Sequence, residues 1–209
     1  MYYNRHNLIL GFHGCDEEIC QRLINSSNEF YFNRNPYDWL GYGMYFWEND
    51  FLRAHQWALE KQKQGKIRQP AVLGALIDPG NCCDFMNSKH TKQLARHFGD
   101  VKDYLNDLPK NEDVKSDPYK DKLLRNLDCL IIERMHKAML LEQEREKQQF
   151  GFILTPGYDT VRCAFLEGAP VFPGAEIRLK NHIQICVRNP KSILAFFLPR
   201  LVLPSILAA

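Results

Sequence analysis

The chain has 209 residues, of which 45% are hydrophobic, and this is enough to bury the core of one domain that carries a sizeable insertion. Its 27 basic and 25 acidic residues leave a formal charge of +2, which gives no strong field for attracting nucleic acid or an anionic membrane. The seven cysteines are scattered and contain no CxxC pair, so the sequence suggests neither a disulfide framework nor a zinc site.

The amino-terminal segment MYYNRHNLIL has no long apolar core and no small-residue cleavage site. We therefore expect no secretion signal and a cytoplasmic protein.

The first 85 residues predict strands and helices around an aromatic loop. We expect a strand at about Asn7–Phe12 and a helix that begins at Asp16, whose side chain can cap it. After the loop, Asp50 opens a second helix with apolar residues spaced along one side. Residues 71–81, AVLGALIDPGN, form a continuous apolar run that closes at a Pro-Gly pair, which is typical of a buried strand and a turn.

Residues 86–149 differ in character, because they are charged and helix-periodic, with a break near 108–120. Apolar residues from Leu124 to Ala138 recur at three- and four-residue steps, so the second half of this region predicts one long amphipathic helix. We interpret its charge-rich end, EQEREKQQ, as a solvated helix face. The region as a whole is expected to be a helical insertion.

Strand-like segments return after residue 149. They are FGFIL at 150–154, TVRCAFLEG at 160–168, HIQICVRN at 182–189 and ILAFF at 193–197. Strands at both ends of the chain with helices between them predict an α+β fold, a single domain over residues 1–199 in which the terminal segments come together.

The apolar carboxy-terminal segment, residues 192–209, does not predict a membrane span. Pro199, Arg200 and Pro204 interrupt it well short of the roughly 20 apolar residues that a spanning helix needs. We expect residues 200–209 to be a tail that packs on the domain or on a partner. The final Leu-Ala-Ala resembles the end of the bacterial ribosome-rescue degradation tag, so a partner that buries the tail would control the lifetime of the protein.

Three short segments carry a family resemblance. LILGFHGCDEE at 8–18, YDWLGYGMYFWEND at 37–50 and NHIQICVRN at 181–189 resemble the ADP-ribosyltransferase superfamily in its polymerase-like and diphtheria-toxin-like branch. That branch has a His on the first strand, a Tyr in a Gly-x-Gly-hydrophobic-Tyr-Phe segment, and usually a Glu on a late strand. The resemblance implies split antiparallel β-sheets around an NAD cleft. Residues 158–190 are also similar to bacterial members found among toxin and defence proteins.

The resemblance implies a role for each matching residue. His13 would hydrogen-bond the adenosine-side ribose of NAD, unless it is a satisfied core histidine. Gly14 would offer its backbone to the nicotinamide amide, and its lack of a side chain would let the ligand approach closely. Tyr45 would stack on the nicotinamide ring, and Tyr42 or Trp39 would complete the cleft by stacking, with ordinary core packing as the alternative for these two.

Gln184 occupies the position where the branch usually has its catalytic Glu. Glutamate stabilises the oxocarbenium-like transition state by its charge, whereas Gln184 can hold the ribose hydroxyl but supplies no negative charge. This favours a single transfer, weak activity or no activity over polymer synthesis. Glu167 and Glu176 are alternative sources of a carboxylate.

His182 and Arg53 complete the candidate site. His182 lies two residues before Gln184 on the same strand, so both side chains share a face. We expect it to orient the acceptor or accept its proton, with a surface-facing histidine as the alternative. Many relatives have a helix serine that touches nicotinamide, and Arg53 stands at that position here. The replacement argues against tight binding of the nicotinamide ring.

The sequence therefore predicts a mono-ADP-ribosyltransferase with NAD as co-substrate. It would act on a protein, RNA or DNA acceptor, and it needs no metal because the leaving group is already a cationic pyridinium. The resemblance implies a toxin, toxin–antitoxin or phage-defence setting, with an antitoxin or chaperone partner. Two alternatives remain: a catalytically inactive sensor of NAD or ADP-ribose, and a module that stacks nucleobases without turnover.

Overall fold

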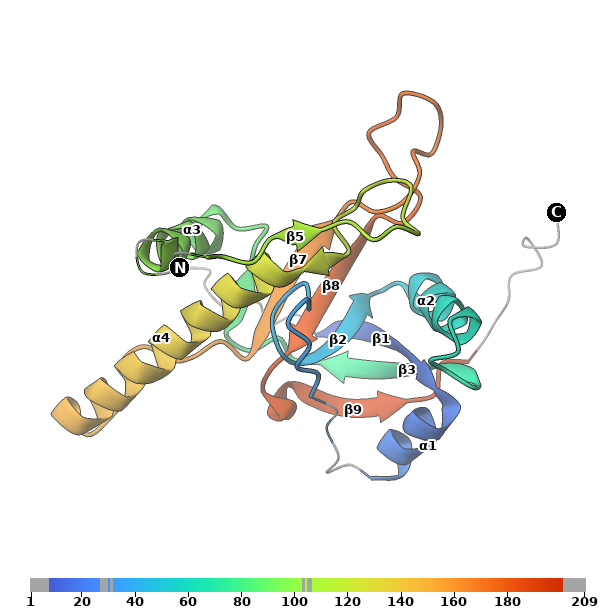
Figure 1. Cartoon of the computed structure of the whole chain (residues 1–209). Helices are drawn as coiled ribbons and strands as arrows, with labels where there is room; N and C mark the ends of the chain where they lie inside the picture. Colours follow the sequence, from blue (N-terminus) through green and yellow to red (C-terminus); the bar gives the residue numbers. More distant parts are fainter. Residues whose placement is uncertain (1–7, 27–29, 31, 103, 105–106, 201–209) are drawn as a thin grey trace.

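A computed structural model describes residues 8–26, 30, 32–102, 104 and 107–200 (Figure 1). The expected tail at 200–209 lies, apart from Arg200, outside the described residues, as does Asn7 at the start of the first expected strand. Within the described ranges, no helix has both the length and the apolar character that crossing a membrane requires.

A seven-stranded mixed sheet forms the centre of the protein, with the strand order β4-β7-β8-β2-β1-β3-β9. The strands are β1 Ile9–Asp16, β2 Met44–Glu48, β3 Pro70–Ile77, β4 Cys82–Asp84, β7 Thr160–Phe165, β8 His182–Val187 and β9 Ile193–Phe197. β4 and β7 pair in parallel, and the other neighbours pair antiparallel. The expectation of an α+β fold is confirmed.

The helices are α1 Glu17–Asn25, α2 Phe51–Lys63, α3 Ser88–Lys102 and α4 Asn126–Phe150. Asp16 caps α1 by accepting a hydrogen bond from the backbone N–H of Glu18, and Asp50 caps α2 through that of Arg53, as predicted. A two-stranded ribbon of β5 Asn111–Glu112 and β6 Leu124–Arg125 leads into α4, and a short 3₁₀ helix, Pro190–Ser192, precedes β9.

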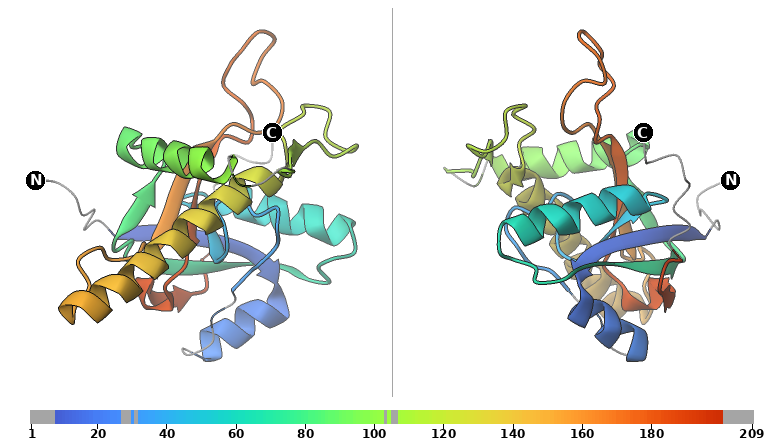
Figure 2. Two further views of the ribbon diagram at one scale, coloured as in Figure 1. Left: turned by 60° about the vertical axis from the view of Figure 1, so that its left-hand side comes forward. Right: turned by 90° about the vertical axis from the view of Figure 1, so that its right-hand side faces the viewer.

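Helices cover both faces of the sheet. α1 and α2 lie on opposite faces of the β1–β3 half (Figure 2). Because side chains alternate along a strand, Cys15 and Phe46 join the core under α1, whereas Phe12 and Trp47 pack toward α2. α4 crosses the β7–β8 half, where its Met135 packs with residues of both strands, and its far end projects beyond the sheet (Figure 1).

β2 joins the two halves of the sheet. It pairs with β8 from Met44 to Trp47, but with β1 only at Gly11↔Glu48 and Phe12↔Trp47. The two halves therefore diverge where β1 continues beside β3 without β2. The expected split pair of sheets is corrected to one hydrogen-bonded sheet that opens at this join.

The expected strand at 150–154 is wrong. α4 runs on to Phe150 and ends at Gly151, whose φ of +79° closes the helix in the left-handed conformation. The carboxylate of Glu146 then accepts hydrogen bonds from the backbone N–H groups of Leu154 and Thr155. This cap satisfies the segment locally, so it needs no partner strand.

The region expected as a helical insertion, about 86–149, contains α3 and all but the last residue of α4, and the expected break near 108–120 contains no helix. Leu124 belongs to β6 rather than to the long helix, which begins at Asn126.

A buried arginine ties three strands together at one end of β2. The Nε and Nη2 groups of Arg162 on β7 donate to the carboxylate of Glu48 on β2, and Nη1 donates to Asp84 on β4 at 3.1 Å. The Arg162 side chain is only 4% exposed. Each of its nitrogens has a carboxylate partner, so the cluster is fully satisfied.

Candidate functional site

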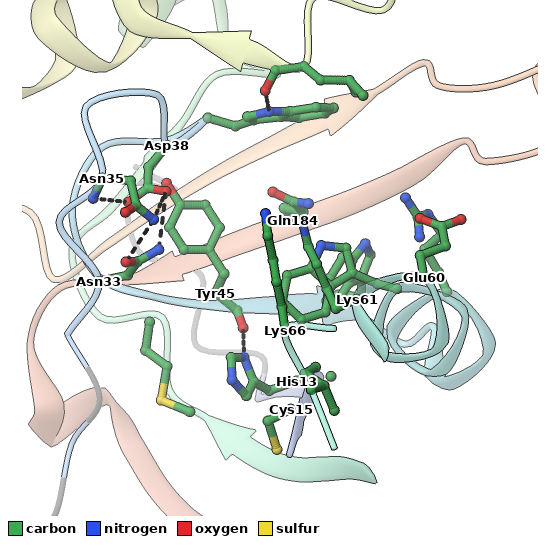
Figure 3. A pocket seen from close by; sticks show the side chains of 18 of the residues that line it. His13, Cys15, Asn33, Asn35, Asp38, Tyr45, Glu60, Lys61, Lys66 and Gln184 are labelled. Carbon is green, nitrogen blue, oxygen red and sulfur yellow. Dashed lines mark hydrogen bonds between the residues drawn. The ribbon is translucent and has the colours of Figure 1, made fainter. Parts of the chain in front are cut away.

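A pocket of about 540 Å³ lies between the sheet, α2 and the loop that precedes β2 (Figure 3). Its size is within the range of about 300–1,000 Å³ that is usual for small-molecule sites. Among the residues predicted from the sequence, those that line it are His13, Gly14, Trp39, Tyr45, Arg53, Glu167 and Gln184. Segments far apart in the sequence thus meet at one cavity.

His13 is held in place through the backbone of β2. Its Nδ1 lies 2.7 Å from the carbonyl oxygen of Tyr45, and its ring contacts Phe46. Burial lowers the pKa of His13 below its ordinary value, so the ring is neutral at physiological pH. A carbonyl can only accept a hydrogen bond, and Nδ1 therefore carries the proton.

Gly14 lines the pocket, and packing of the neighbouring helix α2 explains why this position has no side chain. A Cβ at this position would lie 2.3 Å from the carbonyl oxygen of Ala54 and 3.2 Å from the ring of Trp57. The glycine therefore allows α2 to pack directly against β1. Its closeness to a ligand remains a prediction.

Tyr45 presents its ring to the pocket while its hydroxyl is bound elsewhere. The hydroxyl donates to the carbonyl of Gly41 and accepts a hydrogen bond of 2.8 Å from the N–H of Leu40. Burial raises the pKa of Tyr45 well above its ordinary value. The phenol is thus a neutral, fixed wall of the pocket.

Gln184 lies on β8 opposite Trp47 of β2 and lines the same pocket as Tyr45. Within the described residues, no hydrogen bond of its amide is found. This leaves a neutral amide, able to donate and accept, on the pocket wall.

Of the two further aromatic residues expected in the cleft, only Trp39 lines the pocket. Its indole N–H donates to the carbonyl of Leu123 at 2.9 Å, and the guanidinium of Arg125 lies 4.2 Å from the ring centroid. Tyr42 does not line the pocket, and its backbone N–H donates to the carboxylate of Glu133 on α4 at 2.7 Å.

Arg53 lines the pocket from the first turn of α2 as part of a buried ion pair. Its Nη2 lies 2.7 and 2.9 Å from the two carboxylate oxygens of Glu167. The guanidinium also lies 5.6 Å from the Trp47 ring. The two carboxylates expected as alternatives therefore differ. Glu167 lines the pocket and is paired with Arg53, whereas Glu176 is exposed on the loop between β7 and β8 and does not line the pocket.

His182 shares a face of β8 with Gln184 but lies behind the pocket. Its side chain is fully buried, with ring contacts to Trp39, Trp47 and Phe165. Its Nδ1 lies 2.6 Å from the carbonyl of Lys180, and burial lowers its pKa. The surface-facing alternative is wrong, and the role toward an acceptor remains a prediction.

One polar part of the pocket was not identified from the sequence. Asn33, Asn35 and Asp38 form a hydrogen-bonded cluster in the loop beside Tyr45 (Figure 3). Asp38 is 8% exposed, and burial raises its pKa to about 6. The Asn-x-Asn-Pro-x-Asp pattern at 33–38 is a turn signal that could have located this cluster.

The opposite wall carries cationic side chains. Lys61 of α2 and Lys66 just after it line the pocket near Glu60 (Figure 3). Burial lowers the pKa of Lys61, whose ammonium lies 5.1 Å from the centroid of the Trp57 ring. Over the residues that the structure describes, no group of three or more His, Cys, Asp or Glu side chains is arranged to hold a metal ion.

Comparison of the chain with protein-family models, with curated proteins and with solved structures found no match.

Proposed function

We propose that this protein is a mono-ADP-ribosyltransferase that moves ADP-ribose from NAD to a macromolecular acceptor and releases nicotinamide. The observation that carries the proposal is the meeting of His13, Tyr45 and Gln184, from three separate segments, in one pocket. These are the residues that the sequence resemblance assigns to the dinucleotide.

The chemistry of the pocket fits such a ligand. The ring of Tyr45 offers a flat surface on which a pyridine ring can stack, and neutral His13 can hydrogen-bond a ribose hydroxyl. Lys61 and Lys66 supply positive charge suitable for the diphosphate of a dinucleotide. These contacts would orient NAD without any group that must change its protonation state at neutral pH.

In the proposed reaction, the bond between the nicotinamide nitrogen and ribose C1′ breaks, and its electron pair returns to the ring, so nicotinamide leaves as a neutral molecule. A nucleophilic oxygen or nitrogen of the acceptor forms the new bond to C1′ and gives up its proton to solvent water. Gln184 would hold a ribose hydroxyl through its amide. Because this amide adds no negative charge at the forming cation, we expect one slow transfer and not polymer synthesis.

A macromolecular acceptor is supported by the loop between β7 and β8. It contains pocket-lining Glu167 near its start and exposes Leu166, Phe172, Ile177 and Leu179, each more than 60% exposed. Several large apolar side chains exposed on one loop are typical of sites that bind another molecule. The toxin or defence setting, and an antitoxin or chaperone partner, rest on the sequence resemblance.

The test uses NAD labelled on its adenylate phosphate, incubated with the protein and separately with cell protein, RNA, DNA or buffer. We expect label in one macromolecular fraction, lost with Tyr45→Ala and reduced with Gln184→Ala. Tyr42→Ala is the matched control, since this tyrosine does not line the pocket, and it should keep the transfer. Absence of label from all fractions, with folded protein, would overturn the proposal.

The second candidate function is a sensor that binds NAD or ADP-ribose without turnover. It is favoured by the amide at position 184 and by Arg53, whose ion pair with Glu167 occupies the helix start where relatives have a serine. Gln184→Glu separates the two, because it would create transfer in an inactive sensor and would alter or impair it in a working transferase.

A further inference from the structure

Four carboxylates of the described residues line the pocket, and their partners differ. They are Asp16, Asp38, Glu60 and Glu167. The carboxylate of Glu60 lies 2.7 Å from the ammonium of Lys180, and Glu167 binds Nη2 of Arg53 through both of its oxygens. Each of these two carboxylates therefore balances the charge of a neighbouring cation.

Asp16 and Asp38 accept hydrogen bonds from uncharged donors, but with opposite results. Asp16 caps α1 and accepts a bond of 2.7 Å from the backbone N–H of Arg68, and these backbone hydrogen bonds lower the pKa of Asp16. Asp38 is 8% exposed, and burial raises its pKa to about 6. Asp38 therefore combines a place on the pocket wall with a pKa close to neutral pH.

The Asp38 carboxylate keeps room for one more hydrogen bond. Its Oδ1 accepts from the side-chain amides of Asn33 at 3.1 Å and Asn35 at 3.3 Å, and its Oδ2 accepts from the backbone N–H of Asn35 at 2.9 Å. An ionised carboxylate has about four acceptor positions. Three of them are filled within the described part of the chain, so one position on Oδ2 is open.

The groups that face Asp38 do not neutralise its charge. After burial, the carboxylate of Glu133 on α4, which is paired with Arg188, is the next influence that raises the pKa of Asp38. The other titratable groups nearby are uncharged at neutral pH, because burial raises the pKa of each; they are Tyr42, Tyr45, Cys129 and Cys186. Asp38 is thus an ionised carboxylate at pH 7 with no cationic partner among the residues described.

Asp38 and Gln184 reach the pocket from different elements. Asp38 belongs to the loop before β2 and Gln184 to β8, and Figure 3 shows the ring of Tyr45 between their side chains. The amide of Gln184 can hold a hydroxyl group, but it cannot take up a proton at neutral pH. A carboxylate of the kind that Gln184 lacks is therefore present on the same wall, in the loop.

We propose that the Asp38 carboxylate is the general base that deprotonates the acceptor, an inference that rests on the proposed function. A lone pair of the acceptor O–H or N–H forms the bond to ribose C1′ while the bond to nicotinamide breaks and its electron pair returns to the ring. The acceptor proton moves to Oδ2 of Asp38, and the carboxyl then releases it to water. Proton transfer and the ribose contact are thus divided between Asp38 and Gln184.

The experiment measures initial rates of transfer from NAD labelled on its adenylate phosphate to cell protein, RNA or DNA, with the full chain, between about pH 5 and 8. The wild-type rate should rise with pH through an inflection near pH 6, because only the ionised carboxylate accepts a proton. Asp38→Asn should lower the rate about 100-fold at about pH 7.5 and remove the inflection. Its dissociation constant for NAD, measured by calorimetry, should change less than about twofold.

Asp117→Asn is the matched control. Asp117 also accepts hydrogen bonds from uncharged donors, the backbone N–H groups of Tyr119 and Asp121, and it does not line the pocket. This variant makes the same chemical change in another loop and should keep the wild-type rate and pH profile.

A second variant tests the base without altering it. Glu133→Gln removes the neighbouring charge that raises the pKa of Asp38, so the inflection in the rate should move to lower pH. An inflection that stays where the wild type has it would contradict the assignment of this titration to Asp38.

The outcomes separate the base from the proposed function. If the wild type transfers label and Asp38→Asn does so at the same rate and with the same pH profile, the base is overturned and the transferase stands. If Asp38→Asn weakens NAD binding in proportion to the rate and keeps the inflection, Asp38 binds the dinucleotide and is not the base. If the wild type labels no fraction, the transferase and the base are overturned together.

Discussion

Two buried arginines of this protein differ in how fully they are satisfied. The Arg162 side chain is 4% exposed, and its three nitrogens donate to Glu48 and Asp84. The Arg53 side chain is 5% exposed, but only its Nη2 has a partner, in Glu167. The two side chains are almost equally buried, but every side-chain nitrogen of Arg162 has a hydrogen-bond partner, whereas Nε and Nη1 of Arg53 have none. The difference indicates that Arg162 holds strands together, whereas Arg53 keeps donors free next to a pocket.

The largest effect is expected at the satisfied arginine. Arg162→Met removes the guanidinium that pairs with the carboxylates of Glu48 and Asp84, which are 14% and 13% exposed. We expect the free energy of unfolding to fall by about 3–5 kcal/mol, measured by urea denaturation. Arg145→Met is the control, because Arg145 pairs with Glu142 on the surface and should cost less than about 1 kcal/mol. A loss below about 1 kcal/mol at Arg162 would contradict its structural role.

The second effect concerns the helix that positions Arg53. Gly14→Ala forces a Cβ to within 2.3 Å of the Ala54 carbonyl, so α2 must move away from β1. We expect a loss of about 3 kcal/mol in unfolding free energy together with weaker binding in the pocket. Gly99→Ala in α3 meets no atom within 4 Å and should instead stabilise by about 0.5–1 kcal/mol. Equal effects of the two substitutions would show that α2 is not closely packed on β1.

A smaller loss is expected from Arg53→Met, and it is the direct counterpart of Arg162→Met. Glu167 loses its main partner but keeps Lys180 at 3.8 Å, and two unpaired nitrogens disappear with the guanidinium. These contributions oppose each other, so we expect unfolding free energy to fall by only about 1–2 kcal/mol. If chemical denaturation gives the same loss as for Arg162→Met, the contrast between the two arginines fails.

The smallest effect is a pH dependence at Asp38, a buried carboxylate whose hydrogen-bond donors are the neutral groups of Asn33 and Asn35. Because its pKa is raised to about 6, the folded protein holds a proton between about pH 4 and 6 that the unfolded chain has released. The Asp38 carboxyl thus contributes most to the free energy of unfolding at low pH, and this contribution is lost as the pH rises through 6.

Asp38→Asn removes this dependence. Relative to the wild type, the variant should gain about 1 kcal/mol of unfolding free energy between pH 4.5 and 7. Denaturation of both proteins at the two pH values measures it, and a relative change of opposite sign would contradict the raised pKa.

Local signals in the sequence predicted much of the fold. Asp16 and Asp50 mark the helix starts because a cap acts on neighbouring backbone groups. β9 spans Ile193–Phe197, as the apolar segment ILAFF predicted. The segment after Phe150 was misjudged because its apolar residues read as a strand, while the cap from Glu146 that replaces strand pairing has no sequence signature.

Site residues were predictable as far as strand alternation and the family resemblance reach. Alternation places His182 and Gln184 on one face, but it carries no information on depth, and Trp39 and Phe165 cover the histidine. Tyr42 does not line the pocket, and its backbone N–H bonds to Glu133, a partner 91 residues away that no local pattern reveals. The departures therefore come from long-range contacts.

The bound hydroxyl of Tyr45 has a consequence for the entropy of ligand binding. Because it donates to Gly41 and accepts from Leu40, the ring is immobilised by its own loop before any ligand arrives. The loss of conformational freedom at this side chain then occurs during folding, and a flat ligand meets an ordered surface. The Tyr45 hydroxyl would thereby favour binding of a flat ligand that it does not touch.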